Sequence, residues 1–313
     1  MKEDKQKSDK IPDMVSILGI NIHPITKKDF EKKIVYFLKD GQQHYIVTTN
    51  PEFIITAATD REFKKIINYA DLSIADGNGL IWASHFLARP VKVSSGFTRQ
   101  KAKAYRKRKI RQQLFFTLAV NLLRPSSSRN VIPERLSGSD IIFDICRITA
   151  ENDHSLFLLG GEKDVSLEAR LKLEKMFPEI IISGIKGGFI KDSISDEELV
   201  ETVNKAKPDV LFISLGHPYQ EKWIFRNLDK MPTVKIAVGI GGSLDFLSGK
   251  IRRAPEWMQK INLEWLYRLI QEPRRYQRIK RAVYEFPKLV YQHKIVETER
   301  AKEEKDNQKI NSF

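Results

Sequence analysis

One aspartate stands at a position where an acid–base group could work. Asp76 ends the apolar run DLSIAD and is followed at once by the turn Gly77-Asn78-Gly79. At the end of a buried strand a carboxylate loses water, which raises its pKa and suits it to accept a proton from a substrate hydroxyl. An Asp-Gly pair is equally typical of a plain turn, and the spacing alone does not choose between the two.

Polar side chains follow other apolar runs in the same way. Thr48 and Asn50 could hydrogen-bond sugar hydroxyls, although Asn50 is also placed to cap a helix. Gln220 and Glu221 open a helical segment after a Gly-His-Pro turn, where Glu221 could serve only the helix dipole. A further set shares turns that could bring backbone N–H groups to a phosphate: Gly77, Asn78, Gly160, Gly216, Gly241 and Gly242.

Several familiar kinds of site are missing from the sequence. No G-x-G-x-x-G follows the first strand and no G-x-x-x-x-G-K-[ST] occurs, which disfavours dinucleotide and P-loop sites. The histidines form no metal-binding pattern and Cys146 is the only cysteine, so we expect no metal, no cofactor and no intrachain disulfide. Without a D-x-D triplet to hold a divalent ion, a leaving diphosphate would need cations, for which Arg135, Arg252 and Arg253 are candidates.

These residues stand at the ends of alternating strand and helix patterns. Thr26 and Asp29 predict a capped helix over 26–39, and Asn50 with Pro51 predicts the start of the next helix. Apolar strands separated by helices indicate an α/β fold with a doubly wound, mostly parallel sheet, in which ligands bind at the carboxyl ends of the strands. The predicted strands are 15–22, 44–50, 71–76, 155–161, 179–185, 209–216 and 234–242.

The 313 residues carry a formal charge of +14 that is concentrated in two segments. Residues 89–129 contain twelve Lys and Arg and no acidic residue, and residues 250–294 contain twelve against four Glu. The remainder is mildly acidic. With 41% hydrophobic residues the chain can bury a core, which argues against disorder. The two basic segments therefore indicate contacts to a polyanion, either nucleic acid or anionic lipid.

The residues that adjoin the basic segments favour anionic lipid over nucleic acid as the partner. The polycation KAKAYRKRKIRQQ runs directly into LFFTLAVNLL, and an interfacial helix needs both parts, whereas RNA binding explains only the charge. A solvated basic loop leading into a buried helix is the plain structural alternative. In the second segment Trp257, Trp265 and Tyr267 stand among arginines, which suits a headgroup boundary or ordinary core packing.

No stretch is predicted to cross a membrane. Leu114–Leu123 is too short to span a bilayer, and the first ten residues lack the apolar run of a secretion signal. We divide the chain into an α/β core at 14–247 with a basic-apolar insertion at about 89–130, and a helical membrane-associating appendage at 248–296. Residues 1–13 and 297–313 are expected to be flexible tails.

Six motifs, in order over about residues 14–281, resemble the WecG/TagA/CpsF glycosyltransferases. They are TTNPE (48–52), DGNG (76–79), ERLSGSD (134–140), LGHPYQEKW (215–223), GIGGSLDFLSGKIRRAPEW (239–257) and LEWLYRLIQEPRR (263–275). The resemblance implies an inverting, metal-independent enzyme with a Rossmann-like core. Such an enzyme would move N-acetylmannosamine, its uronate or a hexose from a UDP-sugar to an undecaprenyl-diphosphate-linked saccharide. It would do so for cell-surface polysaccharide or teichoic acid, as a cytoplasmic protein peripheral on the inner membrane face.

The same resemblance assigns expected roles. Asp76 would be the catalytic base, and Thr48 and Asn50 would lie near the acceptor and the transferred sugar. Arg135 and Gln220 would be in the active site, and Asp245 would lie on the nucleoside side. The arginines from Arg252 and Arg253 onward would bind the diphosphate and the membrane. The chain departs from the family pattern in one large respect and, at Gly188 of KGGF, where relatives commonly have an aromatic residue, in a smaller one. Asp76 and Arg135 are 59 positions apart, because the basic-apolar insertion lies between them.

Two other functions stay open on the sequence alone. One is an RNA-binding or RNA-modifying protein that uses the basic segments, although no RNA-binding module is evident. The other is a non-catalytic membrane adaptor, which the intact set of Thr48, Asn50, Asp76 and Gln220 disfavours. The expected partners are a UDP-sugar, a lipid-linked acceptor and an anionic membrane surface, with no nucleic acid. Whether the chain forms a homo-oligomer is left open.

Overall fold

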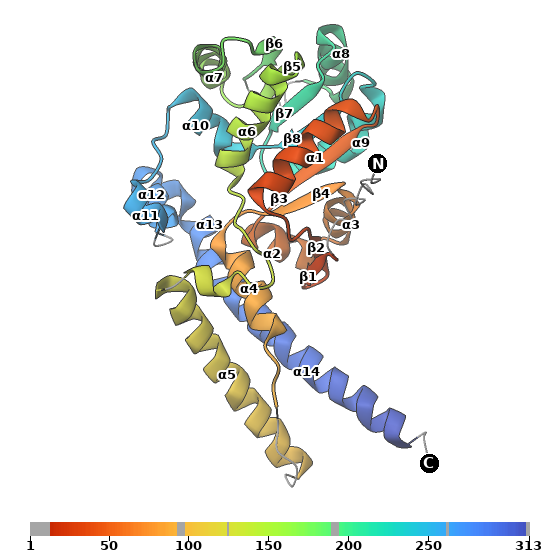
Figure 1. Cartoon of the computed structure of the whole chain (residues 1–313), viewed down its shortest axis with the longest axis vertical. Helices are drawn as coiled ribbons and strands as arrows, with labels where there is room; N and C mark the ends of the chain where they lie inside the picture. Colours follow the sequence, from red (N-terminus) through yellow and green to blue (C-terminus); the bar gives the residue numbers. More distant parts are fainter. Residues whose placement is uncertain (1–12, 93–97, 124, 189–193, 261–262, 311–313) are drawn as a thin grey trace, which may run out of the picture.

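The centre of the molecule is a six-stranded parallel sheet with the strand order β4-β3-β8-β7-β5-β6 (Figure 1). The structure is a computed structural model that describes residues 13–92, 98–123, 125–188, 194–260 and 263–310. The predicted α/β class with a mostly parallel sheet is confirmed. The strands are β3 (His44–Thr49), β4 (Leu72–Ala75), β5 (Ser155–Gly160), β6 (Ile181–Lys186), β7 (Val210–Ser214) and β8 (Ile236–Gly239).

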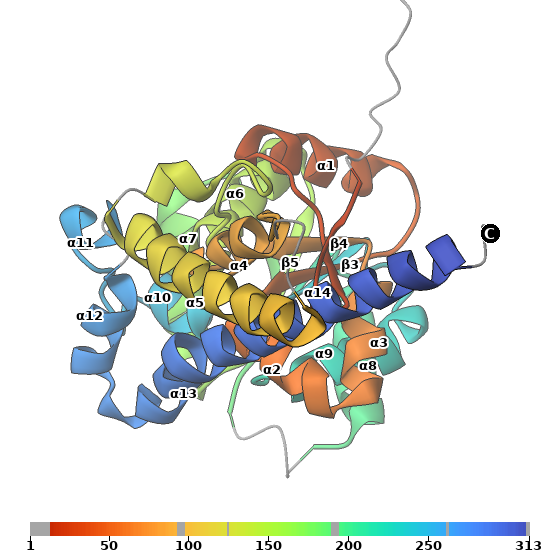
Figure 2. The same cartoon turned by 90° about the horizontal axis from the view of Figure 1, so that it is seen from below.

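Helices cover both faces of the sheet, because the side chains of each strand alternate between two apolar cores (Figures 1 and 2). In β7, Leu211 and Ile213 face one core, and Val210 and Phe212 face the other. One core is closed by α1 (Lys27–Lys39), α6 (Gly138–Glu151), α7 (Lys163–Met176) and α10 (Leu244–Ser248). The opposite core is closed by α2 (Pro51–Thr59), α3 (Arg61–Tyr69), α4 (Asn78–Ala88), α8 (Asp196–Ala206) and α9 (Tyr219–Asn227).

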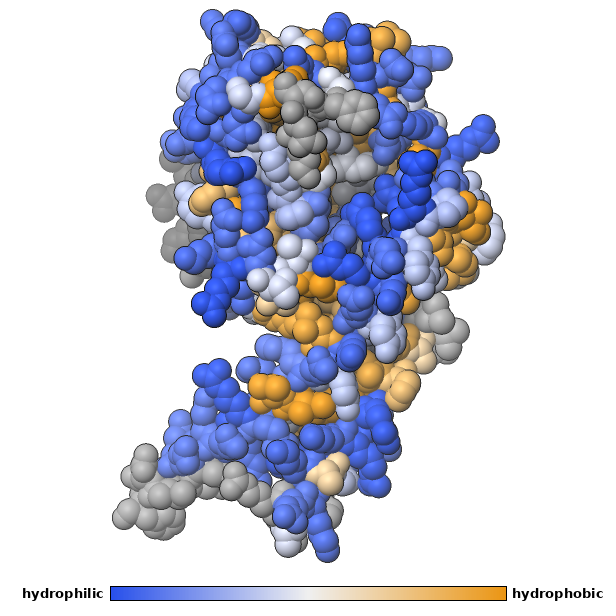
Figure 3. Space-filling view, turned by 180° about the vertical axis from the view of Figure 1, so that it is seen from behind, coloured by the Kyte–Doolittle hydropathy of each residue, from blue (hydrophilic) through white to orange (hydrophobic). Residues whose placement is uncertain are grey.

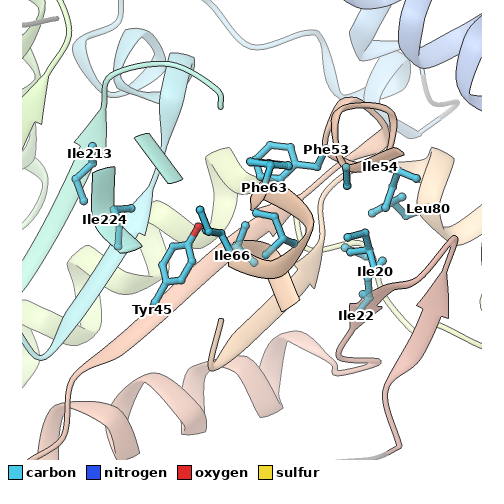
Figure 4. Packing of buried hydrophobic residues seen from close by; sticks show 14 of the residues in the cluster. Ile20, Ile22, Tyr45, Phe53, Ile54, Phe63, Ile66, Leu80, Ile213 and Ile224 are labelled. Atoms are coloured by element: carbon cyan, nitrogen blue, oxygen red, sulfur yellow. The ribbon is translucent and has the colours of Figure 1, made fainter. Parts of the chain in front are cut away.

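Figure 4 shows how the second core is assembled from distant segments. Tyr45 of β3 lies beside Ile66 of α3, while Phe53 of α2 and Phe63 of α3 pack with ring centroids 5.6 Å apart. Burying such rings removes a large apolar area from water, which holds α2 and α3 against the sheet. The start of α2 is thereby fixed at the carboxyl end of β3.

Both predicted helix starts are confirmed. The Thr26 hydroxyl accepts from the Asp29 backbone N–H and the Asp29 carboxylate accepts from the Thr26 backbone N–H, which is a complete capping box. Asn50 caps α2 by accepting from the backbone N–H groups of Glu52 and Phe53, with Pro51 at the first helical position.

The single strand predicted over 15–22 is wrong. The segment forms an antiparallel hairpin of β1 (Val15–Ile17) and β2 (Ile20–Ile22). Leu18 and Gly19 both have positive φ, at 53° and 81°, as a two-residue hairpin turn requires. A leucine rarely takes this conformation, so the run VSILGINI gives no turn signal except its glycine.

Two long helices form an arm that projects from the body (Figures 1 and 2). They are α5 (Arg99–Leu123), which contains most of the insertion, and α14 (Phe286–Ile310). The polycation and the apolar stretch form one continuous helix, so the alternative of a basic loop before a buried helix is wrong. The flexible tail expected at 297–313 is also corrected, because α14 continues to Ile310. Residues 1–12 and 311–313 lie outside the described residues.

Short helices connect the sheet to α14. They are α11 (Glu256–Lys260), α12 (Glu264–Gln271), α13 (Tyr276–Lys280) and a π-helical turn at Arg281–Glu285. Trp257 is 62% exposed and Trp265 is 38% exposed, so these aromatics are not ordinary core residues. Among the described helices, none combines the length and the apolar character that crossing a bilayer requires.

Candidate active site

The carboxyl ends of β3 and β4 bring Thr48 and Asp76 together. The strands pair in parallel with Thr48 opposite Ile74 and Thr49 opposite Ala75, and the Asp76 backbone N–H donates to the Thr49 carbonyl at 2.7 Å. Thr48 is buried at the strand end, and Asp76 keeps part of its surface open. The edge of the sheet therefore presents a hydroxyl and a carboxylate close together.

The start of α6 closes over this pair. The Leu136 backbone N–H donates to the Ala75 carbonyl at 3.1 Å, and the Gly138 backbone N–H hydrogen-bonds to the Asp76 carboxylate. A Cβ atom at Gly138 would lie 3.2 Å from Asp76 Oδ2 and 3.7 Å from Thr48 Cβ. A larger residue would therefore press on the Asp76 carboxylate, whereas its contact with Thr48 would be an ordinary one. The glycine of ERLSGSD thus positions the candidate base, a role that the sequence reading did not assign to it.

Burial raises the pKa of Asp76 to about 6, and it is the largest influence on that group. The Gly138 N–H bond and the nearby Arg135 and Arg268 lower the pKa, while Glu264 raises it again. These influences leave a carboxylate that is ionised at neutral pH but holds a proton more readily than an ordinary aspartate. Such a group can take a proton from a hydroxyl.

Glu264 of α12 lies near Asp76 and within 4 Å of two of the predicted arginines. Arg135 Nη1 lies 3.6 Å from Glu264 Oε2, and Arg253 Nη2 lies 3.6 Å from Glu264 Oε1. Arg253 also pairs with Asp140 in the first turn of α6. Arg252 is not part of this group, since it is exposed and its carbonyl accepts from Gln271 Nε2 at 3.0 Å.

Arg268 is a site residue that the sequence reading missed. Its guanidinium lies over the Phe246 ring, 4.4 Å from the centroid, and its Nε and Nη2 atoms are buried with no hydrogen-bond partner in the described part of the chain. Burial lowers the pKa of Arg268 to about 10, with a further lowering by Arg275. An arginine in a helix is usually a surface charge, so the local sequence provides no reason to place Arg268 in the site. The one sequence feature that could have identified it is its position within the family motif LEWLYRLIQEPRR (263–275).

A second cationic group lies at the end of β8. A Cβ atom at Gly242 would lie 2.8 Å from Arg275 Nη2 and 3.6 Å from Asp245 Oδ2, so the predicted Gly242 and Asp245 adjoin an arginine from the appendage. Arg275 pairs with Glu272 at 2.6 Å. Burial raises the pKa of Asp245. A phosphate beside the backbone of Gly241 and Gly242 would meet a guanidinium there.

Gln220 is fully buried at the start of α9, against Gly239 of β8. Its Nε2 donates to Glu221 Oε1 at 2.6 Å, and its Oε1 has no partner in the described residues. Glu221 is also buried and lies 3.4 Å from His217 Nδ1. His217 stacks on Phe53 and hydrogen-bonds to Thr56 Oγ1 through Nε2 at 2.9 Å. Glu221 therefore holds Gln220 and His217 in place, and complementing the helix dipole is not its main role.

The remaining predicted residues have local structural duties. The Asn50 side chain is occupied in capping α2. A Cβ atom at Gly160 would lie 2.3 Å from the Ser214 carbonyl oxygen, so this glycine permits the close approach of the β5 and β7 ends. Gly77 and Asn78 begin α4 directly after Asp76, and Gly216 precedes the turn into α9. Their backbone groups line the same edge of the sheet.

Three further observations concern what the molecule could bind. Among the described ranges, no group of three or more His, Cys, Asp or Glu side chains is arranged to hold a metal ion. A groove of about 910 Å³ lies away from the sheet edge, between α2, α3 and α14, and none of the predicted site residues lines it. In the view of Figure 3, apolar side chains gather where the arm leaves the body.

Comparison of the sequence with known proteins identifies a family. The family model described as the glycosyl transferase WecG/TagA/CpsF family matches residues 15–117 and 116–301. One relative, from Staphylococcus aureus (strain MRSA252), is 28% identical over 268 residues, which is 85% of this chain and 88% of the relative. Another, from Bacillus subtilis (strain 168), is 27% identical over 251 residues, covering 78% of this chain and 80% of the relative. Both are named N-acetylglucosaminyldiphosphoundecaprenol N-acetyl-beta-D-mannosaminyltransferase.

Proposed function

The chain belongs to the WecG/TagA/CpsF glycosyltransferase family, and on that premise we propose that it transfers a sugar from a UDP-sugar to an undecaprenyl-diphosphate-linked saccharide with inversion at the anomeric carbon. N-acetylmannosamine is the first choice of donor sugar and N-acetylglucosamine of acceptor sugar, because the relatives are named for that transfer. The uronate and a neutral hexose are the alternative donors. Family membership supports a glycosyltransferase over the RNA-binding or RNA-modifying protein and the non-catalytic adaptor.

The observation that carries the proposal is the Asp76 carboxylate, with its pKa near 6, at the edge of the sheet. The acceptor hydroxyl attacks the anomeric carbon as the carboxylate takes its proton. The bond from that carbon to the UDP oxygen breaks, and UDP leaves from the opposite face. Proton removal of this kind typically contributes about 10²–10⁴-fold to the rate.

The arginines supply the charge that a departing diphosphate needs. The buried Nε and Nη2 atoms of Arg268 have no hydrogen-bond partner among the described residues, and Arg275 adjoins Gly242 and Asp245. Cationic donors that are already in place act on the developing negative charge at little reorganisation cost. We propose that they take the part that a divalent metal plays in D-x-D enzymes. Thr48, beside the base, would orient the acceptor.

A UDP-release assay tests the function. The purified chain is given UDP-N-acetylmannosamine, its uronate, UDP-glucose or UDP-N-acetylglucosamine together with a lipid-diphosphate-N-acetylglucosamine acceptor. We expect acceptor-dependent UDP release with one donor, and a product whose anomeric configuration by NMR is opposite to that of the donor. No release with any donor would contradict the proposed substrates, and retained configuration would contradict the mechanism.

A further inference from the structure

The outer face of α5 is an exposed surface that no part of the proposed reaction uses. Among the side chains of this helix that the structure describes, five cationic ones are exposed: Lys101, Lys103, Lys107, Arg108 and Arg111. Phe115 and Phe116 follow them and are 66% and 56% exposed. Arg108, Arg111 and Phe115 are spaced by three and four positions, so they form one stripe along the helix. Lys101 lies on the same line two turns earlier, so three cations and the Phe115 ring share one solvent-facing side. Phe116 is about 100° further round the helix, where the Arg89 guanidinium lies 5.3 Å from its ring centroid.

The inner face of α5 is already occupied. Ala102, Arg106, Ile110 and Thr117 are buried, again at helical spacing. Arg106 forms two hydrogen bonds with Glu299 of α14, at 3.0 and 2.9 Å. The helix is thus fixed to the body and to α14 in one rotation about its axis, which keeps the stripe turned outward. A loosely attached basic segment that is simply solvated would not have a buried inner face and a fixed ion pair of this kind.

The excess of positive charge is concentrated on α5. Residues 89–129 contain no acidic side chain, whereas α14 carries six Lys and Arg against five Asp and Glu and is nearly neutral. A surface that presents positive charge and two exposed phenyl rings together is complementary to anionic headgroups above an acyl layer. A nucleic acid would account for the cations but gives no reason for the neighbouring apolar half of the helix.

The arm is also connected to the candidate base. Trp82 of α4, one turn after Asn78, donates from Nε1 to Thr117 Oγ1 of α5 at 3.0 Å, and both side chains are buried. The first turn of α4 directly follows Asp76. Whatever binds the outer face of α5 is therefore held at a fixed position relative to the carboxyl edge of the sheet.

We propose that the outer face of α5 binds an anionic lipid surface and sets the orientation of the active site on it. The contact is made by the charged stripe through headgroup attraction and by Phe115 and Phe116 through insertion at the acyl boundary. This inference rests on the proposed function, whose acceptor is lipid-linked, and it adds the face of the insertion that meets the membrane.

Vesicle flotation tests the proposal without donor or acceptor, so its outcome is separate from that of the proposed reaction. The full chain is mixed with phosphatidylcholine vesicles, or with vesicles in which about a third of the lipid is phosphatidylglycerol. The charge variant is Lys101→Glu, Arg108→Glu, Arg111→Glu, with a milder version in which the same three become Gln. The apolar variant is Phe115→Ser, Phe116→Ser. Circular dichroism verifies that each variant is folded.

Matched controls lie on the body. Lys28, Lys32 and Lys39 are exposed on α1, and their joint change to Glu removes the same charge from a different surface. Leu167 and Leu171 are exposed on α7, and their change to Ser matches the loss of Phe115 and Phe116. We expect wild type and both controls to float with the anionic vesicles. The charge variant should bind at least about tenfold more weakly, and the apolar variant should lose the binding that remains at high salt.

Three results would overturn the proposal. The first is equal flotation of the wild type and of both α5 variants. The second is wild type that binds RNA but not the anionic vesicles, which would make α5 a nucleic-acid surface. The third is a dimer that the apolar variant dissociates while flotation is unchanged, which would make the stripe a contact between two copies. On a short water-soluble acceptor the α5 variants should keep wild-type turnover.

Discussion

Arg106 and Glu299 are 193 positions apart and form a buried two-bond ion pair between α5 and α14. The Arg106 side chain is 6% exposed and that of Glu299 is 22% exposed. The pKa of Glu299 is lowered, chiefly by its hydrogen bond with Arg106. The C-terminal helix therefore braces the insertion helix. The residues beyond Glu299 are rich in Glu, Lys and Gln, which favour helix without burial.

We expect Glu299→Gln to reduce the free energy of unfolding by about 1–3 kcal/mol, because the buried Arg106 loses its charged partner. Chemical denaturation measures the loss, and hydrogen exchange should show faster opening of α5 and α14. The double variant Arg106→Leu, Glu299→Leu should recover part of the stability, since no unpaired charge remains. A single variant as stable as wild type would mean that the pair does not hold the arm.

Asp76→Asn should lower turnover by at least about 10²-fold while leaving UDP binding nearly intact. The change removes a proton acceptor and preserves the shape of the side chain. Single-turnover kinetics and UDP titration calorimetry measure the two effects, with Asp164→Asn on the exposed face of α7 as the control. A variant that keeps more than about a tenth of the wild-type rate would rule out Asp76 as the base.

The pH dependence of kcat/KM should show an acidic limb with an apparent pKa of about 6, because Asp76 must be ionised to accept a proton. Activity should rise with pH through this region. In Asp76→Asn the limb should vanish from the residual rate. A limb near the ordinary aspartate pKa would show that the side chain is not buried as described.

The free energy of unfolding should also depend on the Asp76 carboxylate, but it should fall as the pH rises, whereas the activity increases. The folded chain binds the Asp76 proton more tightly than the unfolded chain, because burial raises its pKa from 3.8 to about 6. Stability is therefore lost as the pH rises from about 4 to 6 and is not regained above it. Asp76→Asn should exceed wild type in unfolding free energy by about 1–3 kcal/mol at pH 8, and the two should converge below pH 4. Equal stability of the two proteins at pH 8 would contradict the raised pKa.

Arg268→Gln should separate a catalytic from a structural role. Its Nε and Nη2 atoms are buried without partners in the described residues, so removing the charge should leave stability unchanged or improve it. Turnover should fall by about 10²-fold or more if the guanidinium stabilises the leaving diphosphate. Arg252→Gln, at an exposed position outside the arginine group, is the control. A destabilised variant with wild-type turnover would make Arg268 a packing residue.

Activity should survive chelation. The proposed arginines replace a metal, so excess EDTA should leave the initial rate of UDP release within about twofold of the untreated enzyme. The rate is measured before and after chelation and again after magnesium or manganese is added. Loss on chelation that either ion restores would show that the arginines do not suffice.

The sequence by itself determined the alternation of strands and helices, the caps at Thr26 and Asn50, and the placement of Thr48 and Asp76 at strand ends. These features depend on local periodicity and on side chains that bond to their own backbone neighbours, so a short window of residues contains the whole cause. The two-strand hairpin at 15–22 was not predicted, because Leu18 in its turn has a positive φ that leucine seldom adopts.

Only the tertiary structure decided which distant charges meet. Glu264 lies within 3.6 Å of both Arg135 and Arg253. The Arg268 guanidinium is partly buried over the Phe246 ring, and Glu299 forms an ion pair with Arg106. Each outcome depends on burial and on a partner far away in the chain, and neither quantity is encoded in the spacing of nearby residues. An arginine in a helix has the same local pattern whether it faces solvent or a buried site, and only the packing of the whole chain sets its dielectric surroundings and its partner.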